Sequence, residues 1–228
     1  MKNKISLHRM CLLAKSIFCQ NWSRDWKIFL VIIILHAFHF ALNGVVGVYY
    51  PLSLAVIMVL LYLAGTTYRL LEDTKHAMFY MALPVSTAEK FWVNLFFVHI
   101  YYLVAFVLVS VLGFYIGVLL NNIFEIRMMD WTTDLTIHWG SFARSVCILV
   151  AGQAALMFGS VFFKRHAFIK SLLCMGLLFA DLALIFLFIP ELFGFYADVT
   201  EWYSLMCAGL IAIYFWILTY LRLKETEV

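Results

Sequence analysis

Six long apolar runs constrain the fold of this chain more than any other feature of its sequence. They lie near residues 27–42, 49–68, 91–120, 142–163, 168–190 and 203–221. A helix needs about 20 mostly apolar residues to cross the hydrocarbon core of a bilayer. Hydrophobic residues make up 65% of the 228 residues and charged residues 13%, whereas about a quarter of a soluble domain is charged. The sequence therefore predicts an all-α integral membrane protein with six transmembrane helices in one domain, residues 1–228.

The residues before the first run have a different pattern. Between residues 7 and 22 the apolar side chains recur at helical spacing, and basic residues such as Lys4, Lys15 and Arg24 fall elsewhere on the helical wheel. This pattern is typical of an amphipathic helix that lies on the membrane surface. We expect such an interfacial helix over residues 1–25.

Positive charge gives the orientation of the chain. Of the 16 Lys and Arg residues, only Arg127 and Arg144 fall on one side of the predicted spans. Because cytoplasmic flanks retain Lys and Arg during insertion, both termini and residues 69–91 are predicted to face the cytosol. The net charge of +3 is too small to predict nucleic-acid binding.

Residues 69–91 form a polar segment between the second and third spans, and this segment carries its own structural signals. Pro84 lacks a backbone N–H and disfavours helical geometry at Leu83, so a helix must end there. Ser86 and Glu89 then form an S-x-x-E pattern before the next apolar run, which is the spacing of a capping box. We predict a break followed at once by a capped, long helix.

Small residues mark predicted contacts between helices. Gly113 and Gly117 form a G-x-x-x-G motif in the third span, and Ala151, Ala155 and Gly159 form a stripe in the fourth. Helices in lipid approach closely where side chains are small. The pattern leaves open whether these contacts lie within one chain or between two copies.

Polar residues within the predicted spans are candidates for function. Asp181 is the one acidic residue deep in a span, and Gln153 in the fourth span is a candidate partner. Such residues usually face other protein or a watery cavity. His36 and His39 lie on one face of the first span and His99 in the third, but a metal site needs three or four converging ligands. We predict no metal or cofactor in this chain, and a haem or metal redox protein using these histidines is an alternative.

The sequence contains no phosphate-binding G-x-x-x-x-G-K-[ST] motif and no G-x-S-x-G or H-E-x-x-H motif. We therefore predict that the chain has no catalytic residues and is not an enzyme. Energy for any transport must come from a partner or an ion gradient.

Residues 82–97, ALPVSTAEKFWVNLFF, resemble an L-P-x-S-x-x-E-K-F signature of small permease subunits of bacterial ABC-2 type transporters. The layout of spans and the short basic hairpin at residues 159–171 are also similar to that family. The resemblance implies a dimeric permease of the bacterial cytoplasmic (inner) membrane, expected to be an exporter. A separate cytosolic ABC ATPase subunit would bind ATP and Mg. The external region before the last span is shorter than the re-entrant helices of the family's exporters.

The resemblance implies that residues 69–91 act as the coupling segment, on which the ATPase docks. The residues expected to take part are Thr74, Lys75, Met78, Phe79, Leu83, Pro84, Ser86, Glu89 and Lys90. A membrane protein that transports nothing, such as an immunity factor or a partner of a sensor, is a further alternative because it needs none of these residues.

Overall fold

The computed structural model describes residues 5–43, 49–71, 78, 80, 82–124, 139–163, 166–188 and 200–226. All regular structure in these ranges is helical. The predicted all-α class is therefore confirmed for this part of the chain.

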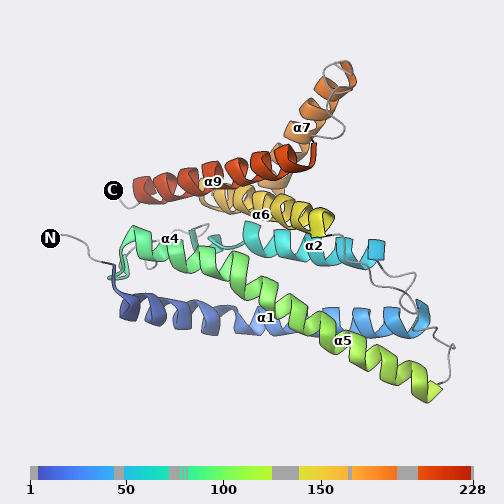
Figure 1. The fold of residues 1–228 in the computed structure, drawn as a ribbon. Coiled ribbons are helices and arrows are strands. Elements are labelled where there is room, and N and C mark those ends of the chain that lie inside the picture. The colour runs from blue at the N-terminus through green and yellow to red at the C-terminus, as the bar shows by residue number, and fades with distance from the viewer. Residues whose placement is uncertain are drawn as a thin grey trace. The chain divides into compact units, whose positions relative to one another are not determined.

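Long helices dominate the structure (Figure 1). Their bounds are α1 Leu7–Asn43, α2 Tyr49–Gly65, the short 3-10 helix η1 Arg69–Leu71, α4 Thr87–Phe96, the π-helix η2 Phe97–Tyr101, α5 Tyr102–Phe124, α6 Trp139–Phe162, α7 Ala167–Phe188 and α9 Thr200–Thr226. Three helical stretches in the described ranges are long and apolar enough to cross a membrane: Thr87–Phe124, Ser145–Phe162 and Met206–Thr226. Shorter apolar helices span Val56–Gly65 and Ala167–Leu177.

The chain forms two compact units. Unit 1 contains Met1–Leu60 and Trp92–Thr136, and unit 2 contains Leu61–Phe91 and Ile137–Val228. Each unit is described by itself below. The expectation of a single transmembrane domain stays a prediction.

Helix α1 differs from the expected interfacial helix followed by a separate span. It is continuous over 37 residues, from Leu7 to Asn43. The physical reason is that this stretch contains neither Gly nor Pro, the residues that most readily break a helix. At 1.5 Å per residue the helix is about 55 Å long, well beyond the roughly 30 Å of a hydrocarbon core.

Unit 1 is built on the contact between α1 and α5. The rings of Phe18 and Tyr101 lie 5.8 Å apart, and those of Phe29 and Phe106 lie 5.7 Å apart. Further along, Gly113 of α5 lies against α1 at His36. Contact positions thus increase together along both helices, so α1 and α5 run parallel.

Unit 2 is built around α6, which contacts both α7 and α9. Its core is a cluster of small residues from α6 and α9, namely Ala151, Ala154, Ala208 and Ala212. The rings of Phe158 and Phe215 lie 5.8 Å apart, so α6 and α9 also run parallel. Gly159 near the end of α6 meets Ser171 near the start of α7, which makes α6 and α7 an antiparallel hairpin.

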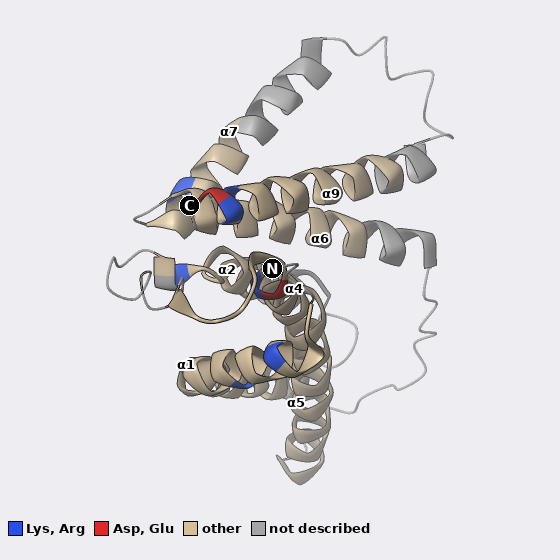
Figure 2. Ribbon diagram, turned by 90° about the vertical axis from the view of Figure 1, so that its left-hand side faces the viewer, with Lys and Arg blue, Asp and Glu red and all other residues tan. Residues whose placement is uncertain are grey.

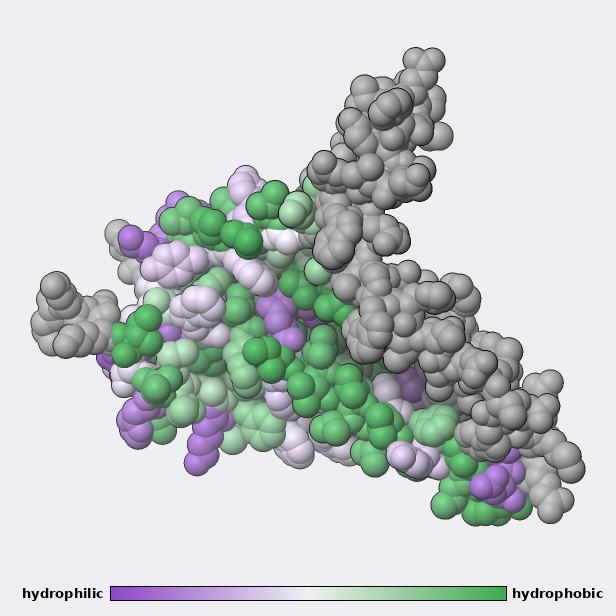
Figure 3. Space-filling model, viewed as in Figure 1, coloured by the Kyte–Doolittle hydropathy of each residue, from purple (hydrophilic) through white to green (hydrophobic). Residues whose placement is uncertain are grey.

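Helix α5 exposes a large apolar surface. Figure 3 shows hydrophobic side chains along its visible face, and the exposed residues include Val104, Val107, Leu108, Val111, Leu112, Ile116 and Leu119. A soluble protein rarely leaves so continuous an apolar surface in water. This surface is suited to contact with lipid.

Candidate functional site

The polar segment of residues 69–91 contains both the predicted break and the predicted cap. Residues 83–85 are non-helical, and α4 begins at Thr87. The Ser86 backbone N–H donates to Glu89 Oε2 at 2.8 Å, and the Glu89 N–H donates to Ser86 Oγ at 3.3 Å. This reciprocal pair is a capping box, and it satisfies two N–H groups that a helix start otherwise leaves without partners.

Buried residues hold the segment against the start of α4. Glu89 is 0% exposed and Lys90 is 1% exposed. The Lys90 ammonium lies 5.4 Å from the centre of the Tyr80 ring, and Tyr80 is itself buried. The ammonium on the ring face is a cation–π contact, which is stronger when it is shielded from water. Glu89 and Lys90 therefore support the segment from inside, and they do not form its outer surface.

The outer surface of the segment includes Met78, which is 63% exposed. Pro84 is also exposed, and Leu83 and Ser86 are half-buried. The other predicted coupling residues, Thr74, Lys75 and Phe79, lie outside the described residues. Tyr80 is only two residues from Met78 in the chain, yet its side chain is buried and that of Met78 is exposed to contact.

The start of α4 is also joined to the end of α9. The Phe91 and Tyr220 rings lie 5.8 Å apart at an interplanar angle of 72°, an edge-to-face arrangement that aromatic pairs prefer. The Phe91 ring therefore ties the start of α4 to α9.

Two further cation–π contacts join the helix ends of unit 2. The Arg222 guanidinium of α9 lies 5.5 Å from the Phe162 ring centre, and the Lys170 ammonium of α7 lies 5.9 Å from that of Phe163. Charged residues gather where α7 begins and α9 ends (Figure 2). The distribution of positive charge in the sequence predicts that these ends face the cytosol.

The predicted small-residue positions lie at contacts within the chain. Gly113 and Gly117 are both buried on α5, and a Cβ added at Gly113 would stand 2.5 Å from His36 Cβ. On α6, Ala151 belongs to the core cluster with α9, Ala155 is buried, and Gly159 meets Ser171 of α7. Backbones approach closely at these points because glycine and alanine leave room.

Sequence reasoning missed a buried polar cluster that links α1 to α5. Asp25 is 3% exposed and pairs with the Arg24 guanidinium at 2.9 Å. Arg24 Nη2 also donates to the Tyr102 hydroxyl at 2.9 Å, and that hydroxyl donates to Asp25 Oδ2 at 3.2 Å. The two charged residues precede the first predicted span by two and three positions. The adjacent opposite charges of Arg24 and Asp25 were the one feature of the sequence that could have indicated this cluster.

Burial has the largest effect on the Asp25 carboxyl, and it raises the pKa above its ordinary value. The charge of Arg24 and the hydrogen bonds from Arg24 and Tyr102 act in the opposite direction. Burial disfavours the ionised form, and nearby positive charge or donors favour it. The Tyr102 hydroxyl is thus one of the groups that lower the pKa of Asp25 against the larger effect of burial.

The polar cluster adjoins a π-helical turn. Residues Phe97–Tyr101 form η2 within an otherwise α-helical stretch from Thr87 to Phe124. Tyr102, which completes the polar cluster, is the residue that follows it. A single π turn inside an α-helix is uncommon and is often found at functional sites. Nothing in the sequence distinguishes this turn from the helix around it.

The predicted intramembrane polar pair is only partly described. Gln153 is buried on α6. Asp181 falls within α7, and its side chain lies outside the described residues.

His36, one of the two histidines of the first predicted span, takes part in packing. His36 is buried, and its Nδ1–H donates to the Ile32 carbonyl at 2.9 Å. Within the described ranges, no group of three or more His, Cys, Asp or Glu side chains is placed to hold a metal ion. His99 lies in the π turn η2.

Comparison of the chain with family models, with curated proteins and with solved structures gave no match. Over its described residues, the structure shows an all-helical chain. Three of the helices there are long and apolar enough to cross a membrane.

Proposed function

We propose that this chain is the membrane-spanning permease subunit of an ATP-driven transporter and that a separate cytosolic ATPase docks on residues 69–91. The observation that carries the proposal is the construction of the coupling segment. The chain breaks at residues 83–85, restarts at a capping box, and fixes that restart to α9 through Phe91 and Tyr220. We expect a segment fixed in this way to pass a displacement on to α9 rather than to bend.

The transporter has six spans with both termini in the cytosol, and it works as a dimer of permease subunits in the bacterial inner membrane. Consecutive spans of such a chain alternate in direction, so the first and third run parallel, as do the fourth and sixth. The directions of α1 with α5, of α6 with α9, and of the α6–α7 hairpin agree with this order. The positive charge of the predicted cytosolic flanks supports the same orientation.

In this mechanism the ATPase contacts the exposed side of the segment, at Met78. Closure of the ATPase pair on ATP displaces the segment, and buried Lys90 and Tyr80 carry the displacement to α4. The α4 and α9 helices then move together because their rings are in contact. Export is the direction expected from the resemblance.

The test is affinity purification of the tagged chain from its native membrane in mild detergent, with quantification of any co-purified P-loop ATPase. We expect the wild-type chain to retain a stoichiometric ATPase. Met78→Arg places a charge on the docking surface, and we expect at least a roughly tenfold loss of bound ATPase, equivalent to about 1.4 kcal/mol.

Leu7→Arg is the matched control, because Leu7 is also an exposed apolar residue outside the predicted spans, at 78% exposure. It should retain the ATPase. Absence of any ATPase from the wild-type preparation contradicts the transporter proposal. Equal retention by the wild type and Met78→Arg contradicts only the docking surface, provided that both chains reach the membrane in equal amounts.

A further inference from the structure

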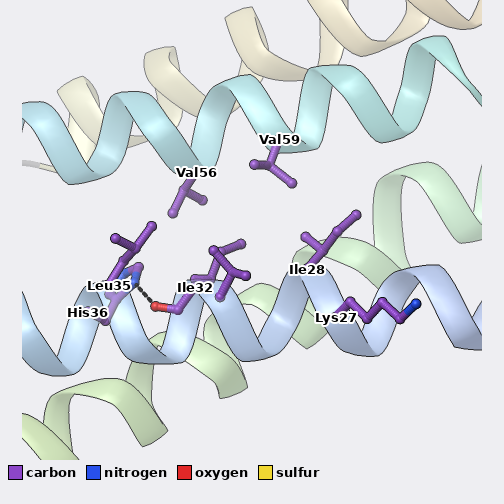
Figure 4. Close-up of a pocket in the computed structure, with 8 residues that line it drawn as sticks. Lys27, Ile28, Ile32, Leu35, His36, Val56 and Val59 are labelled. Carbon is purple, nitrogen blue, oxygen red and sulfur yellow. Dashed lines mark hydrogen bonds between the residues drawn. The ribbon is translucent and has the colours of Figure 1, made fainter.

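An apolar groove lies between α1 and α2 within unit 1 (Figure 4). Its volume is about 300 Å³, at the lower end of the range for small-molecule pockets. The lining residues are Lys27, Ile28, Val31, Ile32, Leu35, His36, Val56 and Val59. All are apolar except Lys27 and His36, and the buried His36 side chain already donates to the Ile32 carbonyl.

The groove is open along its length. Val31 is 53% exposed and Leu35 is 50% exposed, although both line it. Figure 4 shows Val56 and Val59 of α2 directed toward α1, opposite Ile28 and Ile32. An open trough with aliphatic walls on two helices accepts a flexible hydrocarbon better than a rigid or polar molecule, because it offers dispersion contacts and no hydrogen-bonding pattern.

The two ends of the groove differ in charge. Lys27 stands at the end nearer the amino terminus, and in Figure 4 its ammonium points away from the apolar walls. A lysine in this position keeps its alkyl stem against apolar surface while its charge remains at the polar boundary. The groove therefore complements a molecule with an apolar chain and a negative charge at one end.

The length of the groove fits one leaflet of a bilayer. Lys27 and His36 are nine residues apart on α1, a rise of about 14 Å. Half of a hydrocarbon core is about 15 Å thick. By the positive-inside orientation, the Lys27 end lies at the cytosolic surface, where anionic lipids are found.

We propose that this groove binds one acyl chain of an anionic phospholipid from the cytosolic leaflet, with the lipid phosphate at Lys27. The proposal does not depend on an ATPase partner, because it rests only on the groove and its charged end. A lipid held here lies against α1 and bridges it to α2.

The test uses the full chain in vesicles that contain a phospholipid with a photoreactive group on its acyl chain. The probe is phosphatidylglycerol, which is anionic, or phosphatidylcholine, which is neutral, and labelled peptides are mapped by mass spectrometry. We expect labelling to concentrate on residues 28–36 and 56–59 and to be stronger with phosphatidylglycerol. A uniform distribution that labels the exposed face of α5 equally contradicts the proposal.

Two variants test separately the contributions of the apolar walls and of the Lys27 charge to lipid binding. Val59→Trp fills part of the groove, and removing room for about two methylenes should lower groove labelling about tenfold. Its control is Leu112→Trp, since Leu112 is an exposed apolar residue on α5. Lys27→Glu should remove the preference for the anionic probe, whereas Lys224→Glu, at an exposed lysine that does not line the groove, should preserve it.

If Val59→Trp does not fold, Val56→Trp replaces it as the variant that fills the groove. The Lys27→Glu result does not depend on either tryptophan variant. Unchanged groove labelling in a folded Val56→Trp or Val59→Trp chain overturns the proposal. Protein-to-protein crosslinks through residues 28–36 would show a second copy in the groove and would also overturn it.

Discussion

Asp25 illustrates the free-energy penalty of burying a charged side chain and the interactions that offset this penalty. Burial of an isolated carboxylate is strongly unfavourable, so a buried charge needs a partner and hydrogen bonds. Asp25 obtains both, from Arg24 and from the Tyr102 hydroxyl. Because Tyr102 belongs to α5, the residue that stabilises the charge also fixes α1 against α5.

Tyr102→Phe removes the hydroxyl that accepts from Arg24 and donates to Asp25. We expect this variant to lose about 1–3 kcal/mol of stability, since it leaves buried polar groups with fewer partners. Thermal unfolding in detergent measures the loss. Tyr101→Phe is the control, because the contacts of Tyr101 with Phe18, Phe97 and Tyr102 are ring contacts that phenylalanine retains. If both variants unfold at the same temperature, the hydroxyl contributes nothing.

At the scale of the helix, the local sequence is sufficient where the interactions are local. The capping box uses residues three apart in the chain, and the structure contains it as predicted. The break at Pro84 is local in the same sense. Continuity between residues 7 and 43 was not anticipated, because the change from an amphipathic to an apolar pattern was interpreted as a boundary, although nothing in the backbone requires one.

Ser86→Ala removes the capping hydroxyl, and we expect a loss of about 1 kcal/mol, which is the usual worth of a helix cap. Ser86→Thr retains a hydroxyl and should be close to the wild type. Protection of the backbone amides of α4 from hydrogen exchange reports the effect at the helix itself. Equal protection in the alanine and threonine variants would show that Ser86 does not stabilise the helix start.

Gly113→Ala tests the close approach of α5 to α1. The added Cβ would lie 2.5 Å from His36 Cβ and 3.2 Å from the Ile33 carbonyl oxygen, so the helices must separate. Overpacking of this kind typically costs about 1–3 kcal/mol. Gly176→Ala is the matched control, because a Cβ there meets nothing within 4 Å and alanine favours the helix. A Gly113→Ala chain as stable as Gly176→Ala would mean that the helices adjust without cost. Both are measured by thermal unfolding in detergent.

At the scale of the whole molecule, the six-span order with cytosolic termini gives a prediction about access from each side of the membrane. In a chain whose five native cysteines are replaced by serine, Asp130→Cys should react with an impermeant maleimide added to intact cells, because Asp130 lies between the third and fourth predicted spans, on the side predicted to face outward. Glu225→Cys should react only after the membrane is opened, since it follows the last predicted span. Reaction of Glu225→Cys in intact cells would contradict a cytosolic carboxyl terminus.

Much of the fold was predictable because hydropathy and helical spacing are properties of neighbouring residues. The apolar runs predict helices, and within the described part of the chain three of them are helices long and apolar enough to cross a membrane. The candidate site was predictable only in part. The sequence pointed to Ser86, Glu89 and Lys90, but it could not show that Glu89 and Lys90 are buried while Met78 is exposed, because exposure depends on residues far away in the chain.

The sequence by itself determined the helical class, the break at Pro84 and the cap at Ser86, because each follows from interactions among residues within a few positions of one another. Tertiary structure alone decided which small residues meet which helix, that Tyr102 would bond to Arg24 and Asp25, and that α1 and α2 would enclose a groove. These features depend on side chains some 12 to 80 positions apart in the chain, brought together by packing.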